Sequence, residues 1–275
     1  MEYDIIASLV TYKEKPEMIA RVRDSFLNTK LKVKLLHLDN SPTDSLKALH
    51  HGLNAVEYYF NNADLGYGKG HNIGIRKSLD HCKYHLVLNP DIYFDSGVLE
   101  ELFAYAEKHR DVGLLMPKIC NPDGSTQYLC KLLPTPFDLI VRRFLPWQSY
   151  KQRRDDRYEM RFTNYSSVMT APSLSGCFMF MRASALKKVG AFDENFFMYL
   201  EDTDLCRRIS QHYHTIFYPK VSVFHEYGKA SYKSLRYLMH HLASAVYYFN
   251  KWGWFLDSER RRTNSRVLRC ANLIR

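Results

Sequence analysis

Residues 84–91 read YHLVLNPD, and this stretch decides the kind of fold that the sequence predicts. Its apolar run, Tyr84 to Leu88, is short enough for a buried strand. Pro90 has no amide hydrogen, so we expect the strand to end there and the Asp91 carboxylate to face a cleft. The alternative is a turn in which Asp91 caps the helix that follows.

Three similar apolar runs precede this stretch, and segments with helical spacing of apolar residues separate them. Such alternation predicts the α/β class, with a Rossmann-like, mainly parallel sheet and helices on both faces. A length of 275 residues and a hydrophobic content of 46% allow one large domain or two small ones. The runs are Ile5 to Val10, Val33 to Leu38 and Val56 to Phe60, and the helical segments are Pro16 to Asn28, Lys69 to Asp80 and Ser96 to His109.

Polar residues follow each of these runs. Ligands of parallel sheets bind beyond the carboxyl ends of the strands, so we expect the polar residues to converge on one edge. Asp39 could accept a hydrogen bond from the imide edge of a pyrimidine, or bind a ribose. The four clusters are Thr11-Tyr12, Asp39-Asn40-Ser41, Asn61 to Gly70 and Asn89-Pro90-Asp91.

The stretch 61–74 reads NNADLGYGKGHNIG, a glycine-rich loop that runs into a helix. Backbone amides at such a helix start could lie close to a phosphate or a ribose. The loop has neither Gly-Xaa-Gly-Xaa-Xaa-Gly nor a Walker lysine, so a dehydrogenase and a P-loop enzyme do not fit. The alternative is a turn whose glycines only permit tight packing.

Two further sets of residues could carry chemistry. In the stretch 196–204, FFMYLEDTD, the acids Glu201, Asp202 and Asp204 stand beside aromatic residues, which can raise a carboxylate pKa enough for a general base. The alternative is that they occupy the first turn of a helix, where acids are favoured. His225 follows an apolar run and could give a neutral imidazole to a metal, or it could be a core or capping histidine.

Charge is unevenly distributed. From residue 229 onward ten basic residues oppose two acidic ones, so this part carries +8 of the net charge of +10. A near-neutral body with a basic end argues against a nucleic-acid binder and for an end that meets an anionic surface. Trp252, Trp254 and Phe255 precede Arg260 to Arg262, the pairing expected at a membrane interface, although a helix packed on the body explains it equally well.

The start of the chain lacks the pattern of a secretory signal, and six scattered cysteines suggest neither disulfides nor a zinc knuckle. We therefore expect a cytoplasmic protein, with contact at the inner face of the cell membrane as an option. For domains we expect a catalytic unit at 1–228, with a nucleotide-binding half at 1–115 and an acceptor half at 116–228. A basic helical extension at 229–275 would follow.

Together these segments resemble the family 2 inverting glycosyltransferases, over about residues 4–231. Bacterial rhamnosyltransferases that build O-antigen and related surface polysaccharides are the most similar group. Many family members carry Asp-Xaa-Asp where this sequence has Asn89-Pro90-Asp91, which leaves Asp91 as the one sure carboxylate. The matching segments are VTY (10–12), LDNSP (38–42), ADLGYGKGHNIG (63–74), LNPD (88–91), LSGCFMFMR (174–182), VGAFDENFFMYLEDTDLCRR (189–208) and VFHEYGKAS (223–231).

The resemblance implies a GT-A fold, a Mg or Mn ion and transfer by a single displacement. It implies Asp202 as the base that deprotonates the acceptor hydroxyl, and Asp91 and His225 as contacts of the metal on the diphosphate. Glu201 and Gly176 would support the acceptor side. Residues expected to contact the nucleotide are Thr11, Tyr12, Asp39, Asn40, Gly66, Gly70, Asn72 and Asn89.

The expected reaction is transfer of L-rhamnose from dTDP-rhamnose to a saccharide or a polyprenyl-linked acceptor. Donors that would look alike in sequence are UDP-galactofuranose, UDP-glucose and UDP-galactose. A sugar-1-phosphate nucleotidyltransferase is the alternative of another class, but it needs a basic glycine-rich signature after the first strand. A noncatalytic carbohydrate-binding scaffold is the remaining alternative.

Overall fold

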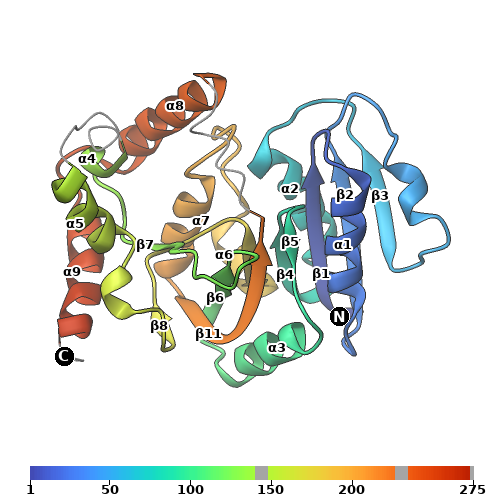
Figure 1. Ribbon diagram of the computed structural model, residues 1–275, viewed down its shortest axis with the longest axis horizontal. Helices are drawn as coiled ribbons and strands as arrows, with labels where there is room; N and C mark the ends of the chain where they lie inside the picture. The colour runs from blue at the N-terminus through green and yellow to red at the C-terminus, as the bar shows by residue number, and fades with distance from the viewer. Residues whose placement is uncertain (140–147, 227–234, 273–275) are drawn as a thin grey trace.

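The computed structural model describes residues 1–139, 148–226 and 235–272. At the centre of these residues is a nine-stranded sheet, with helices around it (Figure 1). Its strands follow the order β3-β2-β1-β4-β10-β6-β11-β5, and β8 pairs with β11. They are β1 (Tyr3–Thr11), β2 (Val33–Asp39), β3 (Val56–Phe60), β4 (Cys82–Leu88), β5 (Ile92–Tyr93), β6 (Val112–Cys120), β8 (Met169–Thr170), β10 (Phe178–Arg182) and β11 (His214–His225); β7 (Cys130–Lys131) and β9 (Ser173–Leu174) form a separate pair.

The predicted strands of the N-terminal half form the parallel part of the sheet, β3-β2-β1-β4. Helix α1 (Pro16–Leu27) covers one face, where Ile5 and Leu9 join its apolar residues in the main core. Helix α2 (Tyr67–Ser78) covers the other face, where Gly74 packs closely against Ser8 of β1. The α/β class with helices on both faces is therefore confirmed.

The sheet is more mixed than the apolar runs predicted. Strand β10 is antiparallel to both of its neighbours, β4 and β6, and β5 is antiparallel to β11. Strand β10 is an apolar run that is buried on both faces of the sheet. Its composition therefore indicates a buried strand, but not whether the strand runs parallel or antiparallel to its neighbours. The expected boundary at residue 115 falls inside β6, in the middle of a continuous sheet.

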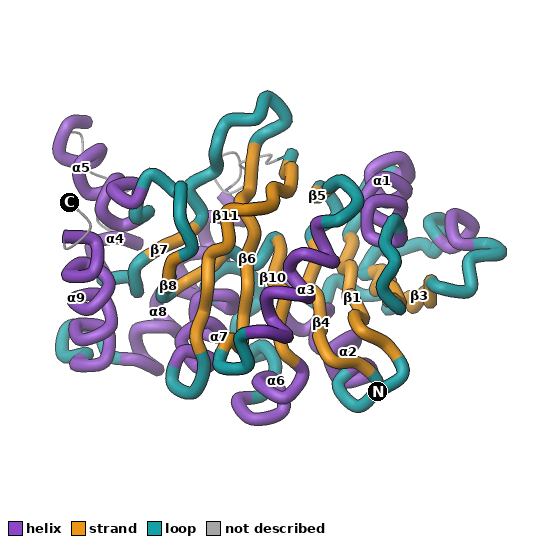
Figure 2. Tube along the Cα trace, turned by 90° about the horizontal axis from the view of Figure 1, so that it is seen from below, coloured by secondary structure: helices purple, strands orange, loops and turns teal. Residues whose placement is uncertain are grey.

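The remaining helices pack around the second half of the sheet (Figure 2). Helix α7 begins at the acidic cluster and contacts β6, β9 and β11. The expected boundary at residue 228 lies outside the described residues. These helices are α3 (Val98–Lys108), α4 (Pro136–Leu139), α5 (Gln148–Tyr158), α6 (Ala183–Val189), α7 (Glu201–Ser210), α8 (Leu235–Trp252) and α9 (Ser258–Asn272), with 3-10 turns at Lys47–His50 and Arg161–Thr163.

Helices α8 and α9 are fixed to α7 by buried charges. Arg207 binds Asp257 through two bonds of 2.7 Å, and the two side chains are only 1% and 2% exposed. Asp204 accepts hydrogen bonds from Lys251 at 2.7 Å and from the Trp252 indole at 2.8 Å. The inner side of the C-terminal helices is thus packed on the body. None of the helices in the described residues has the length and apolar character needed to cross a membrane.

Candidate active site

The part of the site that we expect to bind the nucleotide, called the nucleotide side below, centres on Asp39 at the end of β2. The parallel register places Thr11 opposite Asp39. Thr11 donates its hydroxyl to Asp39 Oδ1 at 3.2 Å, the Ser41 amide donates to the same oxygen at 2.9 Å, and Tyr58 donates to Oδ2 at 2.7 Å. The carboxylate is fully buried. The protein itself therefore supplies three donors to the residue that was expected to read the base.

Two buried histidines continue this network. The Thr11 hydroxyl donates to Asp39, so it accepts from His37 Nε2 at 2.9 Å, and His37 Nδ1 in turn accepts from His50 Nε2 at 2.7 Å. Burial lowers the pKa of His37 to about 3 and that of His50 to about 4, so both rings are neutral at pH 7. Every donor in the network points toward Asp39.

Two glycines bring the start of α2 close to this network. Gly66 has φ +76°, and a Cβ there would lie 2.3 Å from the carbonyl oxygen of Phe197. A Cβ at Gly70 would meet Val10 and the side chain of Asn40, which itself donates to Gly66 O at 3.4 Å. Close packing thus explains both glycines, while it leaves them beside Asp39 at the sheet edge.

Asn72 lies apart from the other expected nucleotide contacts. Its amide donates to Phe192 O and to Glu194 Oε1, both at 2.9 Å, and its Oδ1 accepts from the Phe192 amide at 2.9 Å. The side chain is buried and joins α2 to the segment before α7. Tyr12, by contrast, is half-buried in the loop after β1, next to Thr11.

The metal side consists of Asp91 and His225, which meet at the ends of β4 and β11. His225 Nε2 lies 3.2 Å from Asp91 Oδ1, but the two atoms do not form a hydrogen bond. Asp91 Oδ1 and Asn89 Oδ1 are buried oxygens that have no hydrogen-bond partner among the described residues. Helix α3 has no side-chain cap, so Asp91 is not a helix cap.

These residues fit a divalent cation that is shared with a diphosphate. Carboxylate and amide oxygens are hard ligands, and Mg²⁺ sites in nucleotide enzymes use one or two protein ligands besides the phosphate oxygens. The described residues hold no group of three or more His, Cys, Asp or Glu that could bind a metal ion. Glu14, which the sequence did not single out, lies nearby: burial, and then the charge of Asp91, raise the pKa of its carboxyl.

The three acids at the start of α7 have different surroundings. Burial, and then the charge of Asp202, raise the pKa of Glu201 well above its ordinary value. Asp204 is fully buried and is occupied by Arg208, Lys251 and Trp252. Asp202 alone is partly exposed. Of the three, Asp202 is therefore the acid that can meet an acceptor.

Gly176 links Asp202, the predicted base, to the glycine-rich loop. Its amide donates to Asp202 Oδ2 at 2.9 Å, and its carbonyl oxygen accepts from the Tyr67 hydroxyl at 2.5 Å. The Thr203 amide donates to Asp202 Oδ1 at 2.7 Å. Two backbone amides thus hold the Asp202 carboxylate in one orientation. Tyr67, which also lies near Asp91, was not predicted, although it stands inside the glycine-rich stretch.

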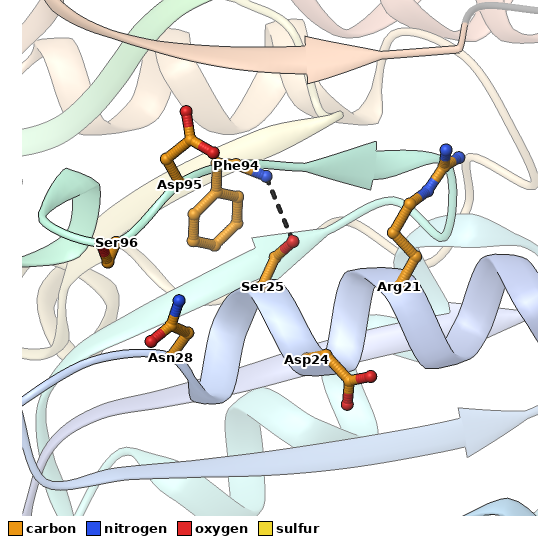
Figure 3. A pocket seen from close by; sticks show the side chains of 7 residues that line it. All are labelled: Arg21, Asp24, Ser25, Asn28, Phe94, Asp95 and Ser96. Atoms are coloured by element: carbon orange, nitrogen blue, oxygen red, sulfur yellow. Dashed lines mark hydrogen bonds between the residues drawn. The ribbon is translucent and has the colours of Figure 1, made fainter.

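A groove behind the metal side contains none of the predicted site residues (Figure 3). It lies between α1 and the segment after β5, where the Phe94 amide donates to Ser25 Oγ at 3.3 Å. Arg21, at one end, forms an ion pair of 2.8 Å with Glu226, whose amide donates to the Asp91 carbonyl oxygen at 3.0 Å. The groove thus borders the backbone that carries Asp91.

Comparison with known proteins identifies the family. Residues 8–190 match the family described as glycosyl transferase family 2. The chain belongs to this family. The transferase is 28% identical over 240 residues to the N-acetylglucosaminyl-diphospho-decaprenol L-rhamnosyltransferase of Mycobacterium tuberculosis, which covers 78% of this chain and 74% of the relative. It is also 28% identical over 185 residues to the rhamnosyltransferase WbbL of Escherichia coli K12, covering 64% of this chain and 66% of WbbL.

Solved structures show the same fold at low identity. GalNAc-T7, crystallised with UDP, GalNAc and Mn²⁺, has a TM-score of 0.63 and 14% identity, over 82% of this chain and 43% of GalNAc-T7. TarS 1–349 of S. aureus has a TM-score of 0.55 and 13% identity, over 81% of this chain and 60% of TarS. The transferase thus spans less than two thirds of either chain. The expected GT-A fold and glycosyltransferase class are confirmed.

Proposed function

We propose that this transferase moves L-rhamnose from dTDP-rhamnose to a saccharide or polyprenyl-linked acceptor, with inversion at the anomeric carbon. The observation that carries the transfer step is the difference in surroundings of the three acids: Glu201 is buried, Asp204 is buried and paired with Lys251, and Asp202 is partly exposed. Support for the donor comes from the rhamnosyltransferases among the relatives.

In the proposed reaction, Asp202 takes the proton of the acceptor hydroxyl. The acceptor oxygen then forms a bond to the anomeric carbon while the bond from that carbon to the diphosphate oxygen breaks. The amides of Gly176 and Thr203 keep the base aimed during this step. A Mg or Mn ion, when bound, would neutralise the charge of the departing diphosphate, and Asp91 and His225 would hold it.

A donor screen tests the reaction. The full chain is mixed with an undecaprenyl-diphosphate-linked N-acetylglucosamine acceptor, Mn²⁺, and either dTDP-rhamnose, UDP-galactofuranose, UDP-glucose or UDP-galactose. We expect transfer from dTDP-rhamnose to exceed transfer from the others at least tenfold. A preference for a UDP-sugar would replace the donor assignment, and no transfer from any donor would reject this acceptor.

We also propose that the C-terminal helices touch an anionic membrane. Leu235, Met239 and Val246 lie on the exposed side of α8, away from its packed residues, and Phe255 and Leu256 are 72% and 88% exposed at the turn into α9. Figure 1 shows α8 at the outer edge of the molecule. Exposed arginines of α9 follow, and Arg261 donates to the Phe255 carbonyl oxygen at 3.2 Å. Exposed apolar side chains next to arginines can insert between the headgroups of anionic lipids, while the arginines bind the lipid phosphates.

The contact is tested with the double variant Phe255→Ser/Leu256→Ser. It should sediment with vesicles containing 30% phosphatidylglycerol less than one third as well as the unaltered chain, whereas the control Val168→Ser, at another exposed apolar residue, should sediment normally. Equal sedimentation of both variants would reject the contact. Light scattering measures the oligomeric state of each protein. If the unaltered chain forms a dimer through α8 and the double variant does not, the difference in sedimentation would reflect dimerisation, and the membrane contact would be rejected.

A further inference from the structure

A chain of hydrogen bonds runs from an exposed turn toward His225. The Ser125 hydroxyl donates to Asp123 at 2.6 Å, so Ser125 Oγ accepts from Asn121 Nδ2 at 2.8 Å. Asn121 Oδ1 is then left to accept from Gln127 Nε2 at 2.7 Å. Because the Asp123 carboxylate only accepts, every donor in the chain has a fixed direction.

Gln127 connects this chain of hydrogen bonds to the ring of His225, and its own orientation is set by the chain. Its second N–H donates to the His225 carbonyl oxygen at 2.8 Å, and its Oε1 lies 2.9 Å from His225 Nδ1. An amide turned by 180° would set Oε1 against two acceptor oxygens, so only the observed orientation satisfies the network. Nδ1 must therefore donate. Both side chains are buried, Gln127 at 8% and His225 at 3% exposure, so water does not compete.

We propose that Gln127 is a positioning residue that keeps the proton of the His225 ring on Nδ1 and leaves the Nε2 lone pair facing Asp91. The inference rests on the proposed role of His225 as a metal contact. With the ring proton on Nδ1, His225 Nε2 and Asp91 Oδ1, which lie 3.2 Å apart, are two acceptors that a cation would stabilise. Partners of this kind orient metal-binding histidines in other proteins.

The test compares Gln127→Met, which removes the acceptor and both donors, with Gln127→Glu, which retains an acceptor for Nδ1. In the Glu variant the second oxygen faces two acceptor oxygens and should bind a proton, so the Nδ1 bond survives. The full chain, labelled with ¹⁵N-histidine, gives the tautomer of His225 by NMR without metal, assigned with His225→Ala. Calorimetry gives the affinity for Mn²⁺ in the presence of dTDP.

We expect an Nδ1–H tautomer in the unaltered chain and in Gln127→Glu, and a mixed or Nε2–H ring in Gln127→Met. Mn²⁺ affinity should fall by about tenfold to 100-fold in Gln127→Met and by less than about threefold in Gln127→Glu. An Nε2–H ring in the unaltered chain, or equal Mn²⁺ affinity in all three proteins, would overturn the proposal.

The two readouts separate this inference from the proposed function. If the unaltered chain binds no Mn²⁺ with dTDP, the metal assignment fails, and the tautomer readout still decides whether Gln127 sets the proton. If Mn²⁺ affinity falls equally in both variants while the Nδ1–H tautomer persists, Gln127 acts only through its donors, which overturns the positioning role. Thermal unfolding of each variant shows that the chain is folded.

Discussion

The nucleotide side and the metal side of the site are built in opposite ways. On the nucleotide side, Asp39 receives three donors and two neutral histidines stand behind it. On the metal side, Asp91 Oδ1 and the nearby Asn89 Oδ1 are buried without a hydrogen-bond partner among the described residues. Buried polar groups without partners cost free energy unless a ligand meets them. The protein itself thus supplies the hydrogen bonds of Asp39, whereas beside Asp91 we expect the bound metal and donor to supply them.

The largest effect should come from Asp202. Asp202→Asn removes the proposed base, so kcat should fall about 10²–10⁴-fold while the affinity for dTDP-rhamnose stays within about twofold. Steady-state transfer and calorimetry measure the two quantities, with Asp111→Asn at an exposed site as the control. If turnover is retained in Asp202→Asn, another group is the base.

Asp91→Ala should weaken the affinity for dTDP about tenfold or more with Mn²⁺, and little without it. The unfolding free energy should fall by less than about 0.5 kcal/mol, because Asp91 Oδ1 has no hydrogen-bond partner to lose. Calorimetry and urea unfolding measure these, with the exposed Asp95→Ala as the control. Loss of affinity that is the same with and without Mn²⁺ would count against the metal role.

Thr11→Val tests whether the hydrogen bonds around Asp39 stabilise the protein even without a bound nucleotide. It leaves the His37 Nε2–H without an acceptor and removes one donor from Asp39, so the unfolding free energy should fall by about 1–3 kcal/mol whether or not nucleotide is present. Urea unfolding measures it, and the exposed Thr170→Val is the matched control. Equal stability of the two variants would show that the network contributes nothing.

The last prediction concerns pH. The folded pKa values of His37 and His50, about 3 and about 4, lie below the ordinary value of 6.5, so the unfolded chain binds more protons between these limits. Their contribution to stability is thus complete above about pH 6.5 and decreases as the pH falls toward 4, by about 1.4 kcal/mol per pH unit for each group. Urea unfolding at pH 7, 6 and 5 should show a smaller slope in His50→Gln. Parallel slopes would mean that His50 takes up a proton in the folded state.

The sequence predicted the parallel half of the fold well, because each of its strands is a short apolar run with a polar end. It did not predict the direction of β10, since a run buried on both faces looks the same either way. Residue 115 was expected to separate two halves, yet it lies inside β6. Strand pairing between distant segments is a tertiary property that local pattern does not contain.

For the site, motif similarity singled out Asp91, Asp202 and His225, whose functional roles stay predictions, and the structure brings Asp91 and His225 together. No motif pointed to Gln127, which lies 98 residues from His225 in the sequence and contacts it only in the folded protein. Asn72 stands in the same motif as Gly66 and Gly70, but its helical position turns it toward Phe192. Sequence proximity does not show which way a side chain points.

The buried pair of Arg207 and Asp257 has a consequence for engineering acceptor specificity. Removing α8 and α9 would take Asp257 and Glu259 away from Arg207 and Lys251 away from Asp204, and it would uncover the face of α7 that these helices bury. The helix that begins with the proposed base therefore belongs with the C-terminal helices. A chimera that exchanges modules between related transferases should transplant α7, α8 and α9 together, with the cut before Phe196.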